Sequence, residues 1–333
     1  MLSFNFEEDK IKQEITRLGA KCVLLQMPQG LKPEAIKLAQ LVESCGAIPI
    51  ISFDPCYGAC DIAQTDAEGI EADLIVHFGH TQMVKSSKIP VVYIETHAKT
   101  QITPAVQQAI PLLLGYSKIG LTTSIQHIEN LSKVKQLLTD NGKTVLIGDA
   151  GQLPYAGQLI GCNYSNAKTI ANEVDAFLFI GGGIFHALGI ALGTGKPTII
   201  ADPYDNRAHE IADQAQQLLR QRYANIQATK NAKIVGILVG LRLGQKHLDQ
   251  ALKAKAAAEK SGRTAVLLAG REINPDTLME FPAIDAYINT ACPRISLDTP
   301  NKFQKPILTV NEFMVLCGEI SWTDMLKKGL FES

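Results

Sequence analysis

The sequence lacks the charge imbalance that would attract nucleic acid or an anionic membrane. Its 333 residues carry 32 Lys and Arg against 33 Asp and Glu, which gives a formal net charge of −1. A surface for nucleic acid or anionic lipid needs a basic excess, so neither partner is expected. A protein partner would have to be recognised by shape and by local patches.

The sequence also has little that would direct it into a membrane. The opening residues, MLSFNFEEDKIKQEI, become acidic and polar early, which is not the pattern of a secretory signal. The most apolar stretch, residues 177–195, contains six glycines and His186. We interpret it as a buried strand, a glycine loop and a helix rather than as a membrane span. A reducing, cytoplasmic compartment is therefore expected, where disulfides are rare.

Two short motifs are missing or incomplete. No P-loop G-x-x-x-x-G-K-[ST] occurs, so nothing indicates phosphoryl transfer. The stretch DPCYGACD (54–61) spaces Cys56 and Cys60 like the start of the radical-SAM signature C-x-x-x-C-x-x-C, but the third position is Ala63. Cys56 is therefore expected to be a neighbour of a metal centre at Cys60 and not one of its ligands.

Short apolar runs are plentiful, and they recur in three groups of four. The groups are 22–28, 48–54, 74–79 and 90–95; 118–124, 144–150, 176–183 and 197–203; and 233–240, 264–271, 286–293 and 306–313. Continuous apolar runs are typical of strands buried on both faces of a parallel sheet. Helical patterns such as 129–143 and 247–263 lie between them, which predicts βαβ units with right-handed crossovers.

The groups begin at residues 22, 118 and 233, a period of roughly a hundred residues. We predict an α/β protein of three similar small domains, each a mostly parallel four-stranded sheet flanked by helices, arranged around a central site. The predicted domains are 1–112, 113–222 and 223–333.

One cysteine of each predicted domain lies on the side where open α/β sheets bind ligands, beyond the carboxyl ends of the strands. These are Cys60, Cys162 and Cys292. The other cysteines outside the DPCYGACD stretch, Cys22, Cys45 and Cys317, are expected to be small core residues.

Three thiolates from three domains suit a [4Fe–4S] cluster with one iron left open for a substrate. A tetrahedral zinc ion with three cysteines and a water is the competing interpretation, and three unrelated cysteines is the simplest one. The positions alone leave these alternatives open.

Several segments together are similar to a known family. They are MPQGLK (27–32), DPCYGACD (54–61), VHFGHT (76–81), PVVYIE (90–95), GGGIFHALG (181–189), ADPY (201–204), GQK (244–246) and NTACPRISLD (289–298). The sequence resembles the archaeal diphthamide synthases, and the resemblance runs nearly end to end. It implies that Cys60, Cys162 and Cys292 hold a [4Fe–4S] cluster and that Cys56 does not.

The resemblance also implies a reaction and its partners. The substrate would be S-adenosylmethionine (SAM), cleaved reductively between sulfur and the methionine Cγ with release of methylthioadenosine. The 3-amino-3-carboxypropyl group would pass to C2 of a histidine imidazole on translation elongation factor 2. A homodimer and an electron donor are implied as well.

Binding of SAM needs groups that hold its aminocarboxypropyl arm. Arg294 could grip the carboxylate with its bidentate fork, or be an ordinary surface arginine. The other candidates have equally plain structural alternatives as turns, caps or core residues: Gly244, Gln245, Gly182, Gly183, His186, Asp202 and Tyr204. His77 and His80 bracket a predicted strand end, where they would face the cleft or cap the strand.

Two other functions fit parts of the same pattern. A lyase of the quinolinate-synthase type also draws one cysteine from each of three α/β domains, and there the open iron acts as a Lewis acid on a small dicarboxylate. A non-catalytic scaffold with a structural metal, or with none, is the other. The YGACD and NTACPRIS segments favour the transferase.

Overall fold

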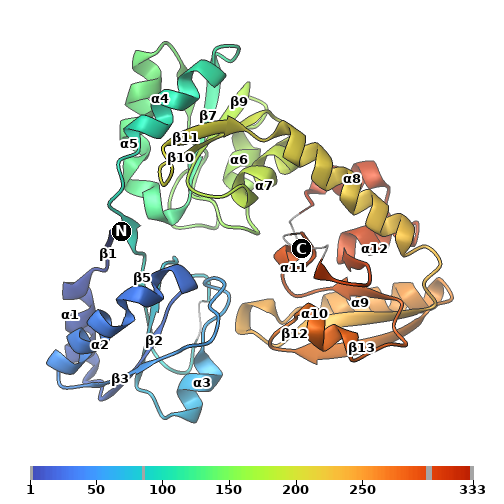
Figure 1. Cartoon of the computed structure of the whole chain (residues 1–333), viewed down its shortest axis with the longest axis horizontal. Coiled ribbons are helices and arrows are strands. Elements are labelled where there is room, and N and C mark those ends of the chain that lie inside the picture. Colours follow the sequence, from blue (N-terminus) through green and yellow to red (C-terminus); the bar gives the residue numbers. More distant parts are fainter. Residues whose placement is uncertain (1–2, 85–86, 298–301, 331–333) are drawn as a thin grey trace. The chain divides into compact units, whose positions relative to one another are not determined.

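The computed structural model of the protein describes residues 3–84, 87–297 and 302–330 (Figure 1). The chain divides into two compact units. The first unit contains the chain up to Gln101 together with Ser124–Glu129 and Arg242–Gly244. The second unit contains Ile102–Thr123, Asn130–Leu241 and the chain from Gln245 onward.

The first unit is built on one parallel sheet, in the order β3-β2-β4-β5. Its elements are β1 (Phe4–Asn5), α1 (Glu8–Leu18), β2 (Cys22–Gln26), the 3-10 helix η1 (Gln29–Glu34), α2 (Ala35–Ser44), β3 (Ile48–Ile51), α3 (Gln64–Gly69), β4 (Leu74–Phe78), β5 (Val91–Ile94) and β6 (His97–Ala98). All five residues of β4 are buried. One core packs α1 and α2 on one face of the sheet, and a smaller core packs α3 on the other.

The second unit contains two sheets. The first of them has the order β8-β7-β9-β10-β11, and only β11 is antiparallel to its neighbour. Its elements are α4 (Thr103–Leu112), β7 (Lys118–Thr123), α5 (Leu131–Asp140), β8 (Thr144–Leu146), α6 (Ser165–Ile170), β9 (Ala176–Ile180), α7 (Phe185–Thr194), β10 (Thr198–Asp202), β11 (Arg207–Glu210) and α8 (Ala212–Ala228). The 3-10 helix η2 (Ile125–Asn130) follows β7 in the chain but belongs to the first unit up to Glu129.

The other sheet of the second unit is parallel, in the order β13-β12-β14-β15. Its elements are β12 (Ile234–Gly240), α9 (Leu248–Lys260), β13 (Thr264–Gly270), α10 (Pro275–Met279), β14 (Ala286–Asn289), α11 (Pro293–Leu297), β15 (Ile307–Thr309), α12 (Val310–Leu316) and α13 (Trp322–Lys328). The 3-10 helix η3 (Leu243–Gln245) follows β12 in the chain but belongs to the first unit up to Gly244.

The three sheets share one topology. In each, the second strand in the chain lies at an edge, followed by the first, the third and the fourth. Since their four common strands are parallel, their carboxyl ends meet at one edge of each sheet, where α/β proteins bind ligands. The predicted α/β fold with three similar, mostly parallel sheets is confirmed. The domain boundaries remain predictions. The second predicted boundary, between residues 222 and 223, falls inside the 17-residue helix α8.

Two details differ from the sequence-based expectation. The middle sheet has a fifth strand, β11, whose sequence RAHE is too polar to be recognised as a strand. The run 306–313 is a strand only to Thr309, because the Thr309 hydroxyl and the Glu312 carboxylate form a capping box that starts α12. The segment 177–195 is a strand, a glycine turn and a helix, as predicted. No helix among the described residues is long and apolar enough to cross a membrane.

A repeated aspartate joins the amino ends of two central strands in each sheet. Asp73, Asp175 and Asp285 each stand one residue before the third strand. Each carboxylate accepts two backbone N–H bonds, of 2.7 to 2.9 Å, from the start of the first strand. These bonds hold the pKa of all three carboxyl groups below the usual value. We call this arrangement of one carboxylate and two backbone N–H groups the aspartate staple. It recurs once in each of the three sheets.

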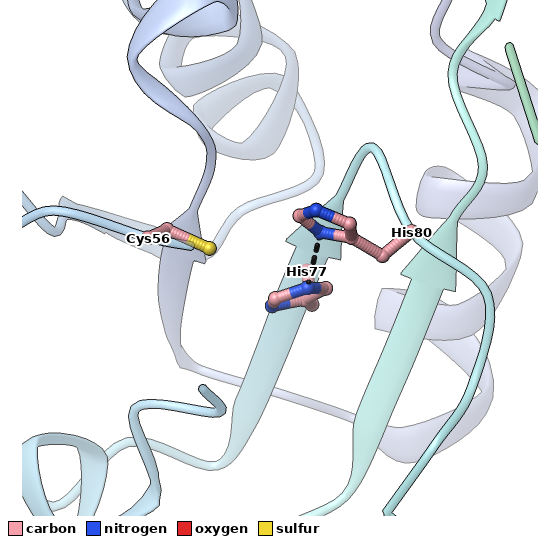
Figure 2. Close-up of side chains that lie close together, drawn as sticks. All are labelled: Cys56, His77 and His80. Atoms are coloured by element: carbon pink, nitrogen blue, oxygen red, sulfur yellow. Dashed lines mark hydrogen bonds between the residues drawn. The ribbon is translucent and has the colours of Figure 1, made fainter. Parts of the chain in front are cut away.

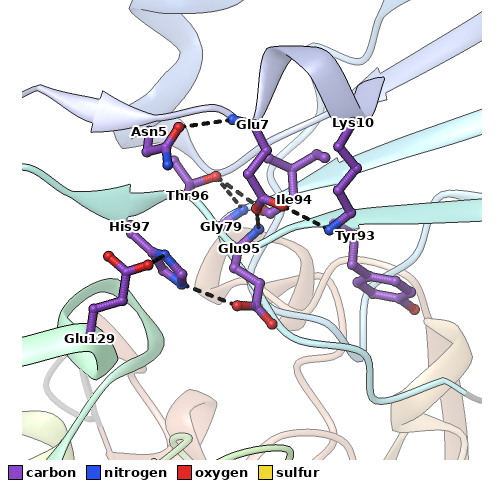
Figure 3. Close-up of polar contacts among 10 residues, drawn as sticks. All are labelled: Asn5, Glu7, Lys10, Gly79, Tyr93, Ile94, Glu95, Thr96, His97 and Glu129. Carbon is purple, nitrogen blue, oxygen red and sulfur yellow. Dashed lines mark hydrogen bonds and ion pairs between the residues drawn. The ribbon is translucent and has the colours of Figure 1, made fainter. Parts of the chain in front are cut away.

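The amino-terminal segment of the first unit is fastened beyond the end of β5 (Figure 3). β1 pairs antiparallel with β6. The Glu7 carboxylate accepts the Glu95 amide at 3.0 Å. Thr96 has a φ of 59°, which is unusual for a β-branched residue, and its hydroxyl bonds to two backbone groups that hold this conformation. The strand end of this sheet is thereby fixed on the side that carries the histidines described below.

We expect Asp285→Ala to lower the free energy of unfolding by about 1 kcal/mol, because two amide donors lose a charged acceptor at an exposed position where solvent screens the charge. Since the folded-state pKa is depressed, this contribution is present above the unfolded pKa and is lost as pH falls through the folded one. Urea unfolding at neutral and acidic pH measures both effects. The exposed Asp149→Ala serves as control; an equal loss there would show that the staple contributes nothing specific.

Candidate functional site

The DPCYGACD segment forms most of the loop 52–63 between β3 and α3, and the Asp61 side chain organises it. The Asp61 carboxylate accepts the Tyr57 amide at 3.3 Å and forms an ion pair with Arg242. The Arg242 guanidinium also lies 5.0 Å from the centroid of the Tyr57 ring. Asp61 is only 5% exposed, so this ion pair is largely shielded from water and holds the loop in one conformation.

The side-chain amide of Gln26, at the end of β2, fixes the same loop. Its Nε2 donates to the Asp61 carbonyl at 2.6 Å, and its Oε1 accepts the Ala63 amide at 3.1 Å. Because each end of the amide meets a backbone group of the opposite kind, its orientation is determined. Ala63, at the position of the missing third cysteine, therefore takes part through its backbone.

The two cysteines of this loop lie in different surroundings. Cys56 is buried, and burial together with the charge of Asp61 raises the pKa of its thiol to about 12. Cys60 is half-buried, and its carbonyl accepts the Gly244 amide at 2.7 Å. A Cβ on Gly244 would lie 2.7 Å from the Cys60 Cα, so a larger residue does not fit there. The more accessible thiol is that of Cys60.

His77, at the end of β4, and His80, in the following turn, form a hydrogen-bonded pair (Figure 2). The Nδ1 of His77 lies 2.9 Å from the Gln26 Oε1, and its Nε2 lies 2.9 Å from the Nδ1 of His80. Burial lowers the pKa of His77 well below its usual value and that of His80 to about 4. Both rings are therefore neutral at neutral pH, and they line the carboxyl edge of the first sheet.

In the second unit, the glycine turn between β9 and α7 meets two other predicted site residues. A Cβ on Gly182 would lie 2.7 Å from the Tyr204 ring and 3.4 Å from the Asp202 carboxylate. The Asp202 carboxylate accepts the Tyr204 amide at 2.9 Å. Burial, and then the charge of Asp202, raise the pKa of Tyr204 to about 12. The structure thus brings Gly182, Asp202 and Tyr204 together, with a neutral phenol beside a carboxylate.

Arg294, in α11, packs against the first residue of α7, Phe185. Its guanidinium is 4.5 Å from the centroid of the Phe185 ring. The neighbouring His186 stacks on Phe179, with ring centroids 5.5 Å apart. Burial, and then the charge of Arg294, lower the pKa of His186 to about 4, so this imidazole is neutral beside the guanidinium.

The loops that carry Cys162 and Cys292 approach each other at the same place. A Cβ on Gly161 would lie 2.7 Å from the Phe185 ring and 3.7 Å from the Arg294 Cδ. Gly161 directly precedes Cys162, and Arg294 follows Cys292 by two residues. Both cysteines are half-buried thiols. Two of the three predicted ligands therefore belong to adjoining loops of one unit.

The Cys292 loop is held from inside by Asn289. Its Nδ2 donates to the Cys292 carbonyl at 2.7 Å and to the Ser296 hydroxyl at 3.0 Å. Its Oδ1 accepts the Ala291 amide at 2.9 Å. The side chain of one buried asparagine therefore replaces the strand pairing that the backbone loses after β14.

A fully buried ion pair supports this loop from the other side. Arg222 of α8 meets both carboxylate oxygens of Glu312, at 2.7 and 2.6 Å, and neither side chain is exposed (0%). Arg222 also donates to the carbonyls of Ser296 and Ile307, each at 2.7 Å. The Glu312 carboxylate accepts the Thr309 amide at 2.7 Å. The pair joins α8, α11, β15 and α12 in one polar network.

Comparison with known proteins bears on what these loops do. The profile of the family described as "Putative diphthamide synthesis protein" matches residues 27–327. The chain is 36% identical to the 2-(3-amino-3-carboxypropyl)histidine synthase of Pyrococcus horikoshii over 314 residues, which are 93% of this chain and 90% of that protein. The chain belongs to the diphthamide synthesis family.

Other members of the diphthamide synthesis family are similar as well. The chain is 29% identical to 2-(3-amino-3-carboxypropyl)histidine synthase subunit 1 of Gallus gallus over 327 residues, 96% of this chain and 78% of that protein. The crystal structure of Dph2 from Pyrococcus horikoshii with a 4Fe-4S cluster has a TM-score of 0.88 at 34% identity, covering 96% of this chain and 93% of that chain. The predicted family and the assignment to an enzyme class are confirmed.

The individual site residues remain predictions within this family. Cys60 belongs to the first unit, whereas Cys162 and Cys292 belong to the second, so the convergence of all three stays a prediction. Gly244 contacts the Cys60 loop. The side chain of Gln245 is 6% exposed, and its Cβ would lie 3.1 Å from a Cβ on Gly240 at the end of β12.

Several residues that build the site went unnoticed in the sequence. Gln26 interrupts an otherwise apolar run at its carboxyl end, and such a polar residue is a usable signal. Asp61 and Arg242 pair across 181 positions, and Phe185 meets Arg294 across the fold. No local sequence pattern predicts contacts between residues so far apart in the chain.

Arg222→Met is expected to lower the free energy of unfolding by about 3–5 kcal/mol, because it leaves the Glu312 carboxylate buried without its partner. Urea unfolding of the whole chain measures the change. Arg220→Met, at an exposed position of the same helix, is the matched control and should change stability by less than about 0.5 kcal/mol. Equal effects of the two substitutions would contradict a central role for the buried pair.

Proposed function

We propose that this chain transfers the 3-amino-3-carboxypropyl group of SAM to C2 of a histidine imidazole on translation elongation factor 2, the first step of diphthamide synthesis. The observation that carries the proposal is the similarity, over 93% of the chain, to a protein named 2-(3-amino-3-carboxypropyl)histidine synthase. That name describes the product of a group transfer to histidine, which favours a transferase over a lyase or a scaffold.

We further propose that a [4Fe–4S] cluster is held by Cys60, Cys162 and Cys292. The donor set fits, since all three side chains are half-buried thiols on loops that follow sheet strands. The similar crystal structure of Dph2 from Pyrococcus horikoshii contains a 4Fe-4S cluster. When bound, a cluster with three protein ligands supplies an electron and an open iron position. Cys56 stays outside the proposed set, as the interrupted C-x-x-x-C-x-x-C spacing at Ala63 and the family resemblance both imply.

Residues of the second unit are suited to hold the aminocarboxypropyl arm of SAM. Arg294 offers a planar fork for a carboxylate, and the Phe185 ring beneath it restricts the plane of the guanidinium. His186 is neutral, so it adds no second positive charge next to Arg294 or the sulfonium. The Asp202 carboxylate beside the Gly182 turn is a partner for the ammonium or the sulfonium.

The remaining roles follow from position. Gly182 and Gly183 allow a substrate to approach the backbone of the turn. Gly244 in the same way allows the Cys60 loop to pack against its backbone. Gln245 and Tyr204 complete the proposed SAM contacts. Which S–C bond is broken depends on how the sulfonium is held relative to the electron source, so these residues act by positioning. A homodimer, an electron donor and a cytoplasmic location belong to the same proposal.

The decisive experiment is anaerobic purification, followed by iron and sulfide analysis and an electron paramagnetic resonance spectrum of the dithionite-reduced protein. We expect a cluster signal that is lost in Cys60→Ala and kept in Cys56→Ala. Reduced wild type with SAM and elongation factor 2 should release methylthioadenosine, and Cys60→Ala should not. Cys45→Ala, at the C-cap of α2 and outside the proposed ligand set, is the activity control.

Three results would each oppose part of the proposal. If the protein bound no iron after anaerobic reconstitution, the proposed cluster would be wrong. If cluster-loaded protein left SAM intact, the proposed transfer reaction would be wrong. A signal that survives in Cys60→Ala would move the cluster to other ligands.

A further inference from the structure

A second set of metal-ligating side chains lies in the first unit. The Cys56 Sγ and one nitrogen of each of His77 and His80 all lie within 4.8 Å of one another. Figure 2 shows the Cys56 sulfur pointing toward the imidazoles of His77 and His80 at the end of β4. We propose that Cys56, His77 and His80 bind a divalent transition-metal ion of the zinc class, separately from Cys60, Cys162 and Cys292.

The hydrogen bonds around His77 prepare it as a ligand. The amide orientation of Gln26 is set by two backbone groups, so its Oε1 must accept a hydrogen from the His77 Nδ1. The Nε2 of the neutral ring then carries the lone pair, and it points at His80. A metal-bound histidine in proteins almost always donates its other N–H to an oxygen in this way.

The distances are close to those of a metal site. Zinc binds histidine nitrogen at about 2.0–2.1 Å and cysteine sulfur at about 2.3 Å, so the ligand atoms of a tetrahedral site lie about 3.3–3.6 Å apart. The His77 Nε2 and His80 Nδ1 are 2.9 Å apart in a hydrogen bond. His80 is half-buried in the turn that follows β4, and the proposal requires its ring to rotate away from the His77 Nε2 so that an ion can enter.

The donor set selects the class of ion. One sulfur and two imidazole nitrogens suit zinc and neighbouring transition metals, and they do not suit magnesium or calcium, which need oxygen ligands. Three protein ligands leave a fourth position for water or another small ligand. The site is mostly enclosed, since Cys56 is 6% exposed and His77 0%. Binding would release the Cys56 thiol proton and would move the His80 ring proton from Nδ1 to Nε2.

The proposed ion would connect two parts of the first unit. Cys56 lies in the loop 52–63, whereas His77 and His80 lie at the end of β4. Bound metal would therefore fasten the loop that carries Cys60 to the sheet, next to the contacts made by Asp61 and Gln26. This inference stands apart from the proposed function, because it uses none of the proposed cluster ligands.

The test uses the full chain with Cys60, Cys162 and Cys292 all replaced by Ser, so that neither a cluster nor cobalt can use those thiols. Titration with Co²⁺ is followed by the thiolate-to-cobalt charge-transfer absorption. We expect one Co²⁺ per chain, with this absorption abolished by adding Cys56→Ser and reversed by Zn²⁺. His80→Asn should weaken binding by more than about tenfold. Cys45→Ser, added to the same background, should leave the titration unchanged.

A second measurement guards against misfolding of the variants. Zn²⁺ should raise the melting temperature of the chain in which Cys60, Cys162 and Cys292 are Ser, and a chelator should reverse the rise. The same addition should not stabilise Cys56→Ser in that background, although this variant melts cooperatively without metal. Absence of Co²⁺ binding, or a charge-transfer band that Cys56→Ser leaves intact, would overturn the proposal.

Discussion

The buried ion pair between Arg222 and Glu312 is the interaction on which the second unit most depends. It lies between α8, α12, β15 and the start of α11, and four hydrogen bonds of the guanidinium are used there. An isolated charge in this position would be costly, so the helices and the strand must be in place together. The Cys292 loop rests on this network through the carbonyl of Ser296. The position of Cys292, a proposed cluster ligand, therefore depends on the Arg222–Glu312 ion pair through the Ser296 carbonyl.

In the first unit, the loop that carries Cys60 is also held by buried polar side chains, here those of Gln26 and Asp61. Gln26 holds the Cys60 loop by two backbone contacts, and Asp61 holds it by an amide and by Arg242. A loop beyond a strand end has backbone groups that the sheet no longer satisfies, and buried side chains that satisfy them give the loop one conformation. The neighbouring histidines are arranged by the same Gln26 amide.

The sequence predicts the strands well, because buried parallel strands are continuous apolar runs and need no partner to be recognised. It also predicts which cysteines follow strands. It does not predict β11, which is polar, or the end of β15, where a capping box overrides an apolar run. Arg222 looks like any arginine of an amphipathic helix, and only the fold reveals its partner. The SAM contacts depend on side chains from distant loops, so motifs suggest candidates without showing which of them meet.

The aspartate staples imply a division of labour between the two edges of every sheet. At the amino edge, the three copies kept the same residue making the same two bonds, as Asp73, Asp175 and Asp285 show. At the carboxyl edge they diverged, so that one copy carries a histidine pair, another a glycine turn with a tyrosine, and the third an arginine after a cysteine. Substitutions at the carboxyl edge therefore leave the bonds at the amino edge intact. The three sheets combine a common scaffold at one edge with different chemistry at the other.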